Sequence, residues 1–327
     1  MNHFQRYVAE EYAEDFWEGR IARRDALKVI AAVTGSLVLA ESFLAACAPQ
    51  DSVGFPPTTT AATLASPTTG SSPAPGTPSA GPSPSAPLAG TVSPDDPDVQ
   101  AGPVEIPLDE ATLLAYLARP IGEERAPVVL VCHENRGLTD HIRDVARRLA
   151  KAGYVALAVD LLSRLGGTDA VGSDNAPGAL TSLPPDQFVQ DFVGGLEFLR
   201  TQPYADVERA GMVGFCFGGG VTWLVATRLT SLKAAVPFYG PHPPVADVPG
   251  IQAAVLAVYA GRDERINSGI PEIEAAMQQQ GKIYEKVVYP DVDHAFHNDT
   301  GSRYDPPSAH DAWRRTLEWF DRYLRAT

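Results

Sequence analysis

A cysteine set between glycines is the residue of this sequence best placed to do chemistry. Cys216 is the centre of the stretch Gly-Phe-Cys-Phe-Gly, which an apolar run over 210–215 precedes and a second apolar run over 221–228 follows. This order predicts a strand, a tight turn and a helix, with the reactive side chain on the turn. Gly214 and Gly218 fit such a turn, because strand and helix pass so close there that neither position has room for a side chain.

At such a turn the cysteine stands at the N-terminus of a helix. The helix dipole and the free N–H groups favour a thiolate there, and later an oxyanion. The alternative is a glycine-rich turn that carries a buried, inert cysteine, and the motif alone does not decide between the two. The residues further along the chain favour the nucleophile.

Two polar residues follow predicted strands downstream of Cys216. Asp263 comes after the strand 253–260, and His294 comes after the strand 283–289. In parallel sheets ligands bind at the carboxyl ends of the strands, and the chain order nucleophile, acid, histidine is that of the α/β-hydrolase triad. His294 would accept the thiol proton, while Asp263 would orient the imidazole. Asp293 adjoins His294, but neighbours in an extended loop point apart, so Asp263 is the preferred acid.

Such a reaction needs an oxyanion hole. Its donors are expected to be the backbone N–H of Phe217, directly after the nucleophile, and that of Asn135 in the loop after the strand 127–132. A cysteine nucleophile gives a thioester intermediate, which water then hydrolyses.

The part of the chain beyond residue 103 alternates strands with helices. Strands are predicted over 104–106, 112–117, 127–132, 155–159, 210–215, 234–239, 253–260 and 283–289, and helices over 140–152, 188–199, 221–228, 271–280 and 308–324. Continuous apolar runs are typical of parallel strands that are buried on both faces. The alternation predicts an α/β domain whose mostly parallel sheet is covered by helices on both faces.

Several stretches resemble the dienelactone hydrolase family. They are Gly-Phe-Cys-Phe-Gly-Gly-Gly at 214–220, His-Glu-Asn-Arg-Gly-Leu at 133–138, Ala-Val-Pro-Phe-Tyr-Gly at 235–240 and the His-x-Phe loop at 294. The stretches at 296–299 and 313–316 are similar to an exported bacterial branch of it. The resemblance covers 103–327 and implies the α/β-hydrolase fold, a triad of Cys216, Asp263 and His294, no cofactor, and hydrolysis of a small ester or lactone. It also implies that Glu134 contacts the resting thiol and takes part in activating it when substrate arrives.

The residues that would hold the substrate are less defined by this resemblance. Shortly after the catalytic histidine, where members of the family hold the substrate carboxylate with an arginine, this sequence has Asn298. Candidates for substrate contacts are Arg136, Arg164, Tyr239, His297, Asn298 and Arg303. An ester or lactone other than dienelactone is therefore an equal expectation. The segment 161–185, rich in Gly, Ser and Asp, is expected to cover the site and set its specificity.

Residues 1–47 resemble a twin-arginine export signal that ends in a lipoprotein processing box. Arg23 and Arg24 precede the apolar run 29–40, and Leu-Ala-Ala-Cys ends at Cys47. Cleavage there would leave Cys47 as a lipidated N-terminus, which anchors the chain to the outer face of the bacterial cytoplasmic membrane or to the cell envelope. The alternative is a short N-terminal membrane or core helix. In either case the segment is expected to take no part in chemistry.

The stretch 48–102, rich in Pro, Thr, Ser, Ala and Gly, predicts a disordered tether, which leaves 103–327 as the catalytic domain. The net charge of -14 and the lack of a basic cluster argue against nucleic-acid binding. No spacing typical of a metal site occurs, and three cysteines are too few for a disulfide framework.

A monomer acting on a small molecule is therefore expected. One rival function is a surface-anchored binding protein that keeps the hydrolase fold without turnover. Another is a redox role for the thiol, which the absence of a Cys-x-x-Cys pair disfavours.

Overall fold

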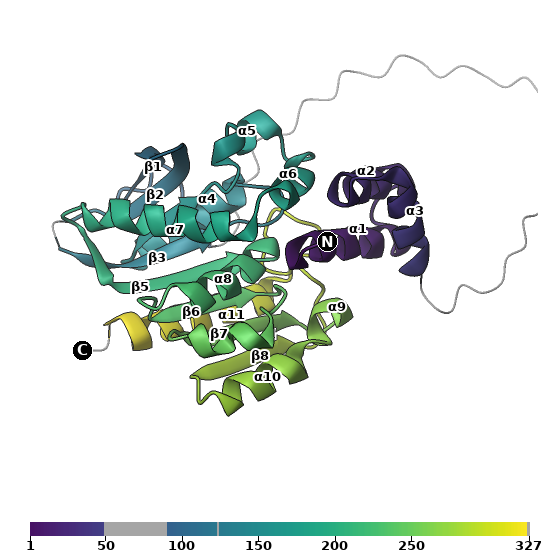
Figure 1. The fold of residues 1–327 in the computed structure, drawn as a ribbon. Helices are drawn as coiled ribbons and strands as arrows, with labels where there is room; N and C mark the ends of the chain where they lie inside the picture. The colour runs from purple at the N-terminus through teal and green to yellow at the C-terminus, as the bar shows by residue number, and fades with distance from the viewer. Residues whose placement is uncertain (49–89, 123, 326–327) are drawn as a thin grey trace, which may run out of the picture.

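The structure, a computed structural model, describes residues 1–48, 90–122 and 124–325. Its centre is a sheet of eight strands in the order β1-β2-β4-β3-β5-β6-β7-β8 (Figure 1). The strands are β1 (Val99–Pro107), β2 (Thr112–Pro120), β3 (Ala126–Cys132), β4 (Val155–Val159), β5 (Ala205–Phe215), β6 (Ala234–Phe238), β7 (Ala254–Ala260) and β8 (Tyr284–Tyr289). Strand β2 runs antiparallel to β1 and β4, and every other pair is parallel.

Helices cover both faces of this sheet. They are α4 (Asp140–Lys151), α7 (Pro185–Arg200), α8 (Phe217–Arg228), α9 (Glu264–Asn267), α10 (Ile270–Gln279) and α11 (Pro306–Phe320). Helices α7 and α8 lie in front of the strands in Figure 1, and α11 lies behind them. The residues of β4, β6 and β7 are all buried, as the apolar runs predict for strands covered on both faces. The predicted α/β-hydrolase fold is confirmed.

The parallel pairing places the loops of the candidate site next to one another. Cys132 at the end of β3 pairs with Gly214 near the end of β5, so the loop that begins at His133 lies beside the turn at Cys216. Strand β7 lies between β6 and β8, so the loops that carry Asp263 and His294 leave the sheet at the same edge.

The structure adds detail where the sequence pattern is weak. Strand β1 begins at Val99, before the expected domain boundary, because residues 99–102 pair with residues 117–120 of β2. Most of the expected tether, residues 49–89, lies outside the described residues. The segment 161–185 contains the 3-10 turn η2 (Ser163–Leu165) and two short helices, α5 (Thr168–Val171) and α6 (Ala176–Ser182).

The N-terminal residues form three helices, α1 (His3–Trp17), α2 (Arg23–Thr34) and α3 (Leu37–Ala46), which pack against the α/β domain (Figure 1). Asn2 caps α1 in a reciprocal pair with Gln5, in which each side chain accepts a hydrogen bond from the other residue's backbone N–H at 2.8 Å. Helix α1 packs against α6 and α8.

Within the described residues, no single helix is long and apolar enough to cross a membrane. Helices α2 and α3 pass that test together by length and composition, but the pair is bent by 115°.

Candidate active site

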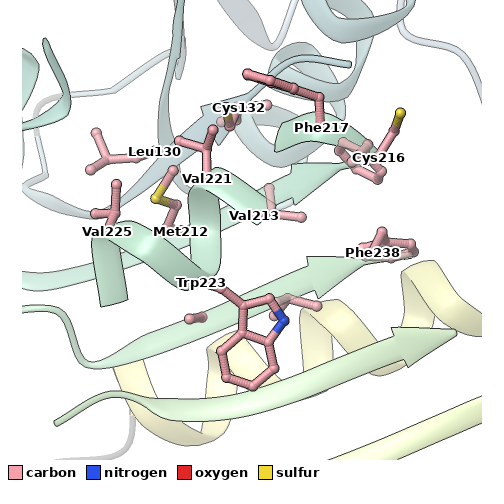
Figure 2. Close-up of a cluster of buried hydrophobic side chains, with 14 of the residues drawn as sticks. Leu130, Cys132, Met212, Val213, Cys216, Phe217, Val221, Trp223, Val225 and Phe238 are labelled. Atoms are coloured by element: carbon pink, nitrogen blue, oxygen red, sulfur yellow. The ribbon is translucent and has the colours of Figure 1, made fainter. Parts of the chain in front are cut away.

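The turn at Cys216 has the geometry that the glycine spacing predicts. Cys216 lies between β5 and α8 with φ 59° and ψ -120°, a strained conformation for a residue with a side chain. A Cβ at Gly214 would overlap the carbonyl oxygen of Gly218, and one at Gly218 would overlap that of His133. Figure 2 shows Cys216 at the edge of the apolar cluster, with its sulfur directed away from the other side chains.

We expect Gly214→Ala to destabilise the protein by about 3 kcal/mol, because the new methyl group overlaps the backbone of Gly218 as well as the side-chain oxygen of Thr222. The free energy of unfolding in urea measures this. Gly102→Ala is the control, since a Cβ there meets nothing within 4 Å. Equal stability of the two variants would contradict the close approach of strand and helix.

His294 and Asp263 are held together beside this turn. The Nδ1 atom of His294 lies 2.6 Å from Oδ2 of Asp263, whose Oδ1 accepts a hydrogen bond from the backbone N–H of Ile266 at 3.2 Å. Burial alone would raise the pKa of Asp263, but the neighbouring His294 and Arg265 lower it, so the carboxylate stays ionised. Asp293 instead lies on the surface, 3.7 Å from Arg262.

The thiol of Cys216 is only 3% exposed and contacts helix α1. It donates a hydrogen bond to Oε1 of Glu11 at 3.5 Å, and the hydroxyl of Tyr7 lies 3.2 Å from the sulfur. Burial raises the pKa of Cys216 well above its ordinary value, and the carboxylates of Glu11 and Glu134 add to the effect. The thiol of Cys216, the expected nucleophile, is therefore neutral at rest, although the backbone N–H of Phe217 favours the thiolate.

Glu134 lies close enough to act on the thiol by its charge, but its hydrogen bond goes elsewhere. Its Oε2 accepts a hydrogen bond from the Asn298 side chain at 2.6 Å. The family resemblance implied that Glu134 contacts the resting thiol. In the structure, the carboxylate that accepts a hydrogen bond from this thiol is that of Glu11. Asn135, an expected oxyanion donor, uses its side-chain amide to donate to Oε2 of Glu11 at 3.0 Å.

A hollow of about 200 Å³ borders these groups. Its lining residues are Glu11, Tyr12, Asp15, Glu134, Asn135, Arg136, Cys216, His294, Ala295, Asn298, Gly301, Ser302 and Arg303. Among the residues expected to contact substrate, it therefore brings together Arg136, Asn298 and Arg303. Both arginines already have acidic partners, since Arg136 lies 3.0 Å from Asp174 and Arg303 lies 3.6 Å from Asp15.

The other expected contacts lie elsewhere. Arg164 pairs with the buried Asp191 at 3.1 Å and lines a different hollow. His297 is buried and stacks on Phe215, with ring centroids 4.9 Å apart. The ring of Tyr239 lies 4.9 Å from that of His294, so it packs against the expected base.

Backbone strain gathers at the same place. Among the described residues, the non-glycine residues with positive φ are Cys216, Tyr239 at 36° and Ala295 at 65°. They are the expected nucleophile, a residue packed on His294 and the residue that follows His294. Strain of this kind concentrates at functional sites, where the surrounding structure holds it in place.

The site residues that the sequence did not indicate come from α1. Tyr7, Glu11 and Asp15 reach the thiol, His294 or Arg303, although no role in chemistry was expected of this segment. Residues 161–185, the expected cover, contribute nothing to the lining of the hollow. The helix itself could be predicted, because its buried side chains recur at helical spacing. This spacing does not indicate which part of the protein the buried face of α1 packs against.

Glu11, Cys216 and His294 are also a group that could hold a metal ion, since their ligand atoms lie within 4.8 Å of one another. Thiolate, imidazole and carboxylate are all zinc ligands. The hydrogen bond from Cys216 to Glu11 and the one between His294 and Asp263 already account for the positions of these three side chains.

We expect Glu11→Gln to shift the pH profile of Cys216 alkylation to lower pH. The substitution removes a negative charge that helps to raise the thiol pKa, so the thiolate forms at lower pH. Rates of modification by iodoacetamide between about pH 6 and pH 11, a range that extends above ordinary thiol ionisation, measure the shift. Glu10→Gln is the control, because Glu10 pairs with Arg6 and does not face the thiol. A profile that stays at the same pH would contradict the influence of Glu11.

A mostly parallel sheet with a strained cysteine turn after β5, an acid after β7 and a histidine after β8 defines the α/β-hydrolase class. Residues 113–324 match the dienelactone hydrolase family, and the chain belongs to that family of carboxylic ester hydrolases.

Similar proteins agree with this placement. A protein of Methylorubrum extorquens that bears the name carboxymethylenebutenolidase is 35% identical over 71% of this chain and 84% of its own. A protein of Escherichia coli K12 with the same name is 36% identical over 72% of this chain and 92% of its own. The crystal structure of a protein from Klebsiella pneumoniae that carries the name dienelactone hydrolase is 33% identical, with a TM-score of 0.64 over 69% of this chain and 99% of that one.

Proposed function

We propose that this chain hydrolyses a small ester or lactone through Cys216, with His294 as the base and Asp263 as the acid that orients it. The observation that supports this is the 2.6 Å contact between His294 and Asp263 beside a thiol held on a strained turn. Each group comes from a different loop, and the three meet at the carboxyl edge of the sheet.

The reaction would begin when Nε2 of His294 takes the proton from Sγ as the sulfur attacks the carbonyl carbon. The negative charge that develops on the carbonyl oxygen would be met by the backbone N–H groups of Phe217 and Asn135. The imidazolium, stabilised by Asp263, would return the proton to the departing alcohol oxygen and leave a thioester.

Water would then complete the cycle. His294 would accept a proton from the water as its oxygen attacks the thioester carbon, and it would return that proton to the sulfur as the C–S bond breaks and the carboxylic acid is released. No cofactor is needed for either half of this reaction.

The substrate would be small. The hollow at Cys216 measures only about 200 Å³ with α1 in place. The relatives named carboxymethylenebutenolidase suggest a lactone, and Arg136 and Arg303 are the residues that could meet a carboxylate on it. In this structure both are paired with acids.

A panel of chromogenic short-chain esters and unsaturated lactones tests the proposal, with intact mass recorded after mixing. The panel is applied to the full chain and to a Phe4→Asp variant. The variant is included because α1 contacts the thiol, and this substitution weakens the packing of α1 on Phe217. Turnover accompanied by an acyl adduct on Cys216 supports a thiol hydrolase. An absence of turnover and adduct in both folded proteins would favour the binding protein without catalysis.

We further propose that the chain is exported and anchored by lipid at Cys47, with no other membrane attachment. The side chains of Arg23 and Arg24 are 58% and 88% exposed, as recognition of a twin-arginine signal requires, and Cys47 is exposed. Cys47→Ser should move the protein out of the membrane fraction of the cells. A membrane fraction that keeps this variant would contradict a lipid anchor at this residue.

A further inference from the structure

Helix α1 fills the positions at which a substrate would react. The hydroxyl of Tyr7 lies 3.2 Å from Sγ of Cys216 and 3.4 Å from Nε2 of His294. Oε1 of Glu11 lies 3.5 Å from the same sulfur and 3.8 Å from the same nitrogen. A reacting carbonyl carbon must come within about 3 to 3.5 Å of the sulfur, and its leaving group must be close to Nε2. Both places are occupied.

The carboxylate of Glu11 stands where a reaction product would stand. One of its oxygens faces the thiol, and the other accepts a hydrogen bond from the side chain of Asn135 at 3.0 Å. The acid released by ester hydrolysis is also a carboxylate beside that thiol. The structure therefore has a side chain of its own in the place of the acyl group.

The helix is docked by more than these polar contacts. Phe4 is buried against the rings of Phe188 and Phe217, with centroids 5.7 and 5.0 Å away. Tyr7 and Glu11 are one helical turn apart and lie on the same face. Both are buried, which a glutamate tolerates only when its charge is paired or hydrogen-bonded.

Charge complementarity adds to the docking. Glu14 lies 3.1 Å from Arg265, and Asp15 lies 3.6 Å from Arg303. The guanidinium of Arg265 also lies over the ring of Tyr7, 4.6 Å from its centroid. An acidic, aromatic helix thus meets arginines that line or border the catalytic hollow.

We propose that the catalytic site is a docking surface for the chain's own helix α1, and that substrate reacts only after α1 has left it. The effect on turnover rests on the proposed function, whereas the docking itself does not. Cleavage before Cys47, which the proposed lipid anchor requires, would remove residues 1–46 and the docked helix with them. The uncleaved chain is then latent, and the cleaved chain is active.

The test releases α1 by changes in α1 alone, in the full chain. Phe4→Asp and Glu14→Lys are combined, because the first removes the aromatic anchor and the second repels Arg265. Glu10→Lys is the matched control, with the same charge change as Glu14→Lys on the same helix, at a residue that pairs with Arg6. All variants carry Cys47→Ala so that alkylation reports on Cys216, since Cys132 is fully buried.

The rate of Cys216 alkylation by iodoacetamide is the first readout, because it requires no knowledge of the substrate. We expect it to rise at least about tenfold in the double variant, equivalent to 1.4 kcal/mol of docking free energy, and to stay unchanged in Glu10→Lys. Hydrolysis of the ester panel should rise in parallel. Hydrogen exchange of the α1 amides confirms that the helix has been released.

The other outcomes separate the two proposals. Free exchange of the α1 amides with no gain in alkylation, or with a fall in hydrolysis, overturns the inference, because α1 would then be no obstacle or would be a working part of the site. Faster alkylation in the double variant without cleavage of any ester upholds the docking of α1 and counts against the proposed hydrolase.

Discussion

Replacing Cys216 by Ala is expected to lower ester or lactone hydrolysis at least about 10³-fold and to leave the fold in place. In the proposed mechanism the sulfur carries the acyl group, and neither His294 nor Asp263 can replace it. The substitution removes one atom from a side chain whose contacts with Tyr7 and Glu11 connect it to α1. The measurement is kcat/KM on the best substrate of the panel, in the full chain and in the variant with α1 released.

Cys47→Ala is the control for this substitution. Cys47 is exposed at the end of α3, so its loss should leave hydrolysis by the uncleaved full chain unchanged. Circular dichroism and urea unfolding show whether the Cys216 variant keeps its fold. A folded Cys216→Ala protein with parental activity would remove the thiol from the mechanism.

Much of the fold and the core of the site could be predicted from the sequence because the signals are local. The glycines at 214 and 218 are dictated by overlaps within one strand-turn-helix unit. Asp263 could be predicted because it follows an apolar run that forms the buried strand β7, and His294 because it follows the next strand along the chain, β8. Parallel strands bring their carboxyl ends to one edge, so the order along the chain sufficed to group these residues.

The contacts around this core could not be predicted, because they depend on which surfaces meet. Arg164 and Arg303 each follow a serine in the sequence, yet Arg164 pairs with Asp191 away from the site and Arg303 lines the hollow at Cys216. Glu134 follows its strand as expected, but Asn298 takes up its hydrogen bond.

Helix α1 shows the same limit most clearly. Its residues have a helical pattern, and its capping box at Asn2 and Gln5 is readable from the sequence. Its docking against Cys216 depends on contacts between residues that are far apart in the sequence. Cys216 and Glu11, which share a hydrogen bond, are 205 positions apart. The same residues also resemble an export signal. Such a resemblance concerns targeting and does not indicate which residues the segment contacts in the folded chain.

Asp263→Asn is expected to lower hydrolysis by about 10²- to 10⁴-fold, and Asp293→Asn by less than about twofold. Asp293 is next to His294 in the sequence, and Asp263 is next to it in the fold. The two acids are therefore a matched pair. Only Asp263 contacts the imidazole, at 2.6 Å from Nδ1, while Asp293 is half exposed and lies 3.7 Å from Arg262. Comparable losses in the two variants would contradict the assignment of Asp263.

The pH dependence of the residual activity distinguishes loss of the base from general damage. The amide of Asn can donate to Nδ1, which favours the tautomer with its proton on Nε2, and that nitrogen then cannot accept the thiol proton. Attack must wait until the thiol ionises without help, and the pKa of Cys216 is raised well above its ordinary value. Because the thiolate fraction grows as the pH rises toward this pKa, the activity of the Asp263→Asn variant should climb with pH over a range in which that of the parent has levelled off. A variant whose loss is the same at every pH would indicate a disturbed site and not a misplaced proton.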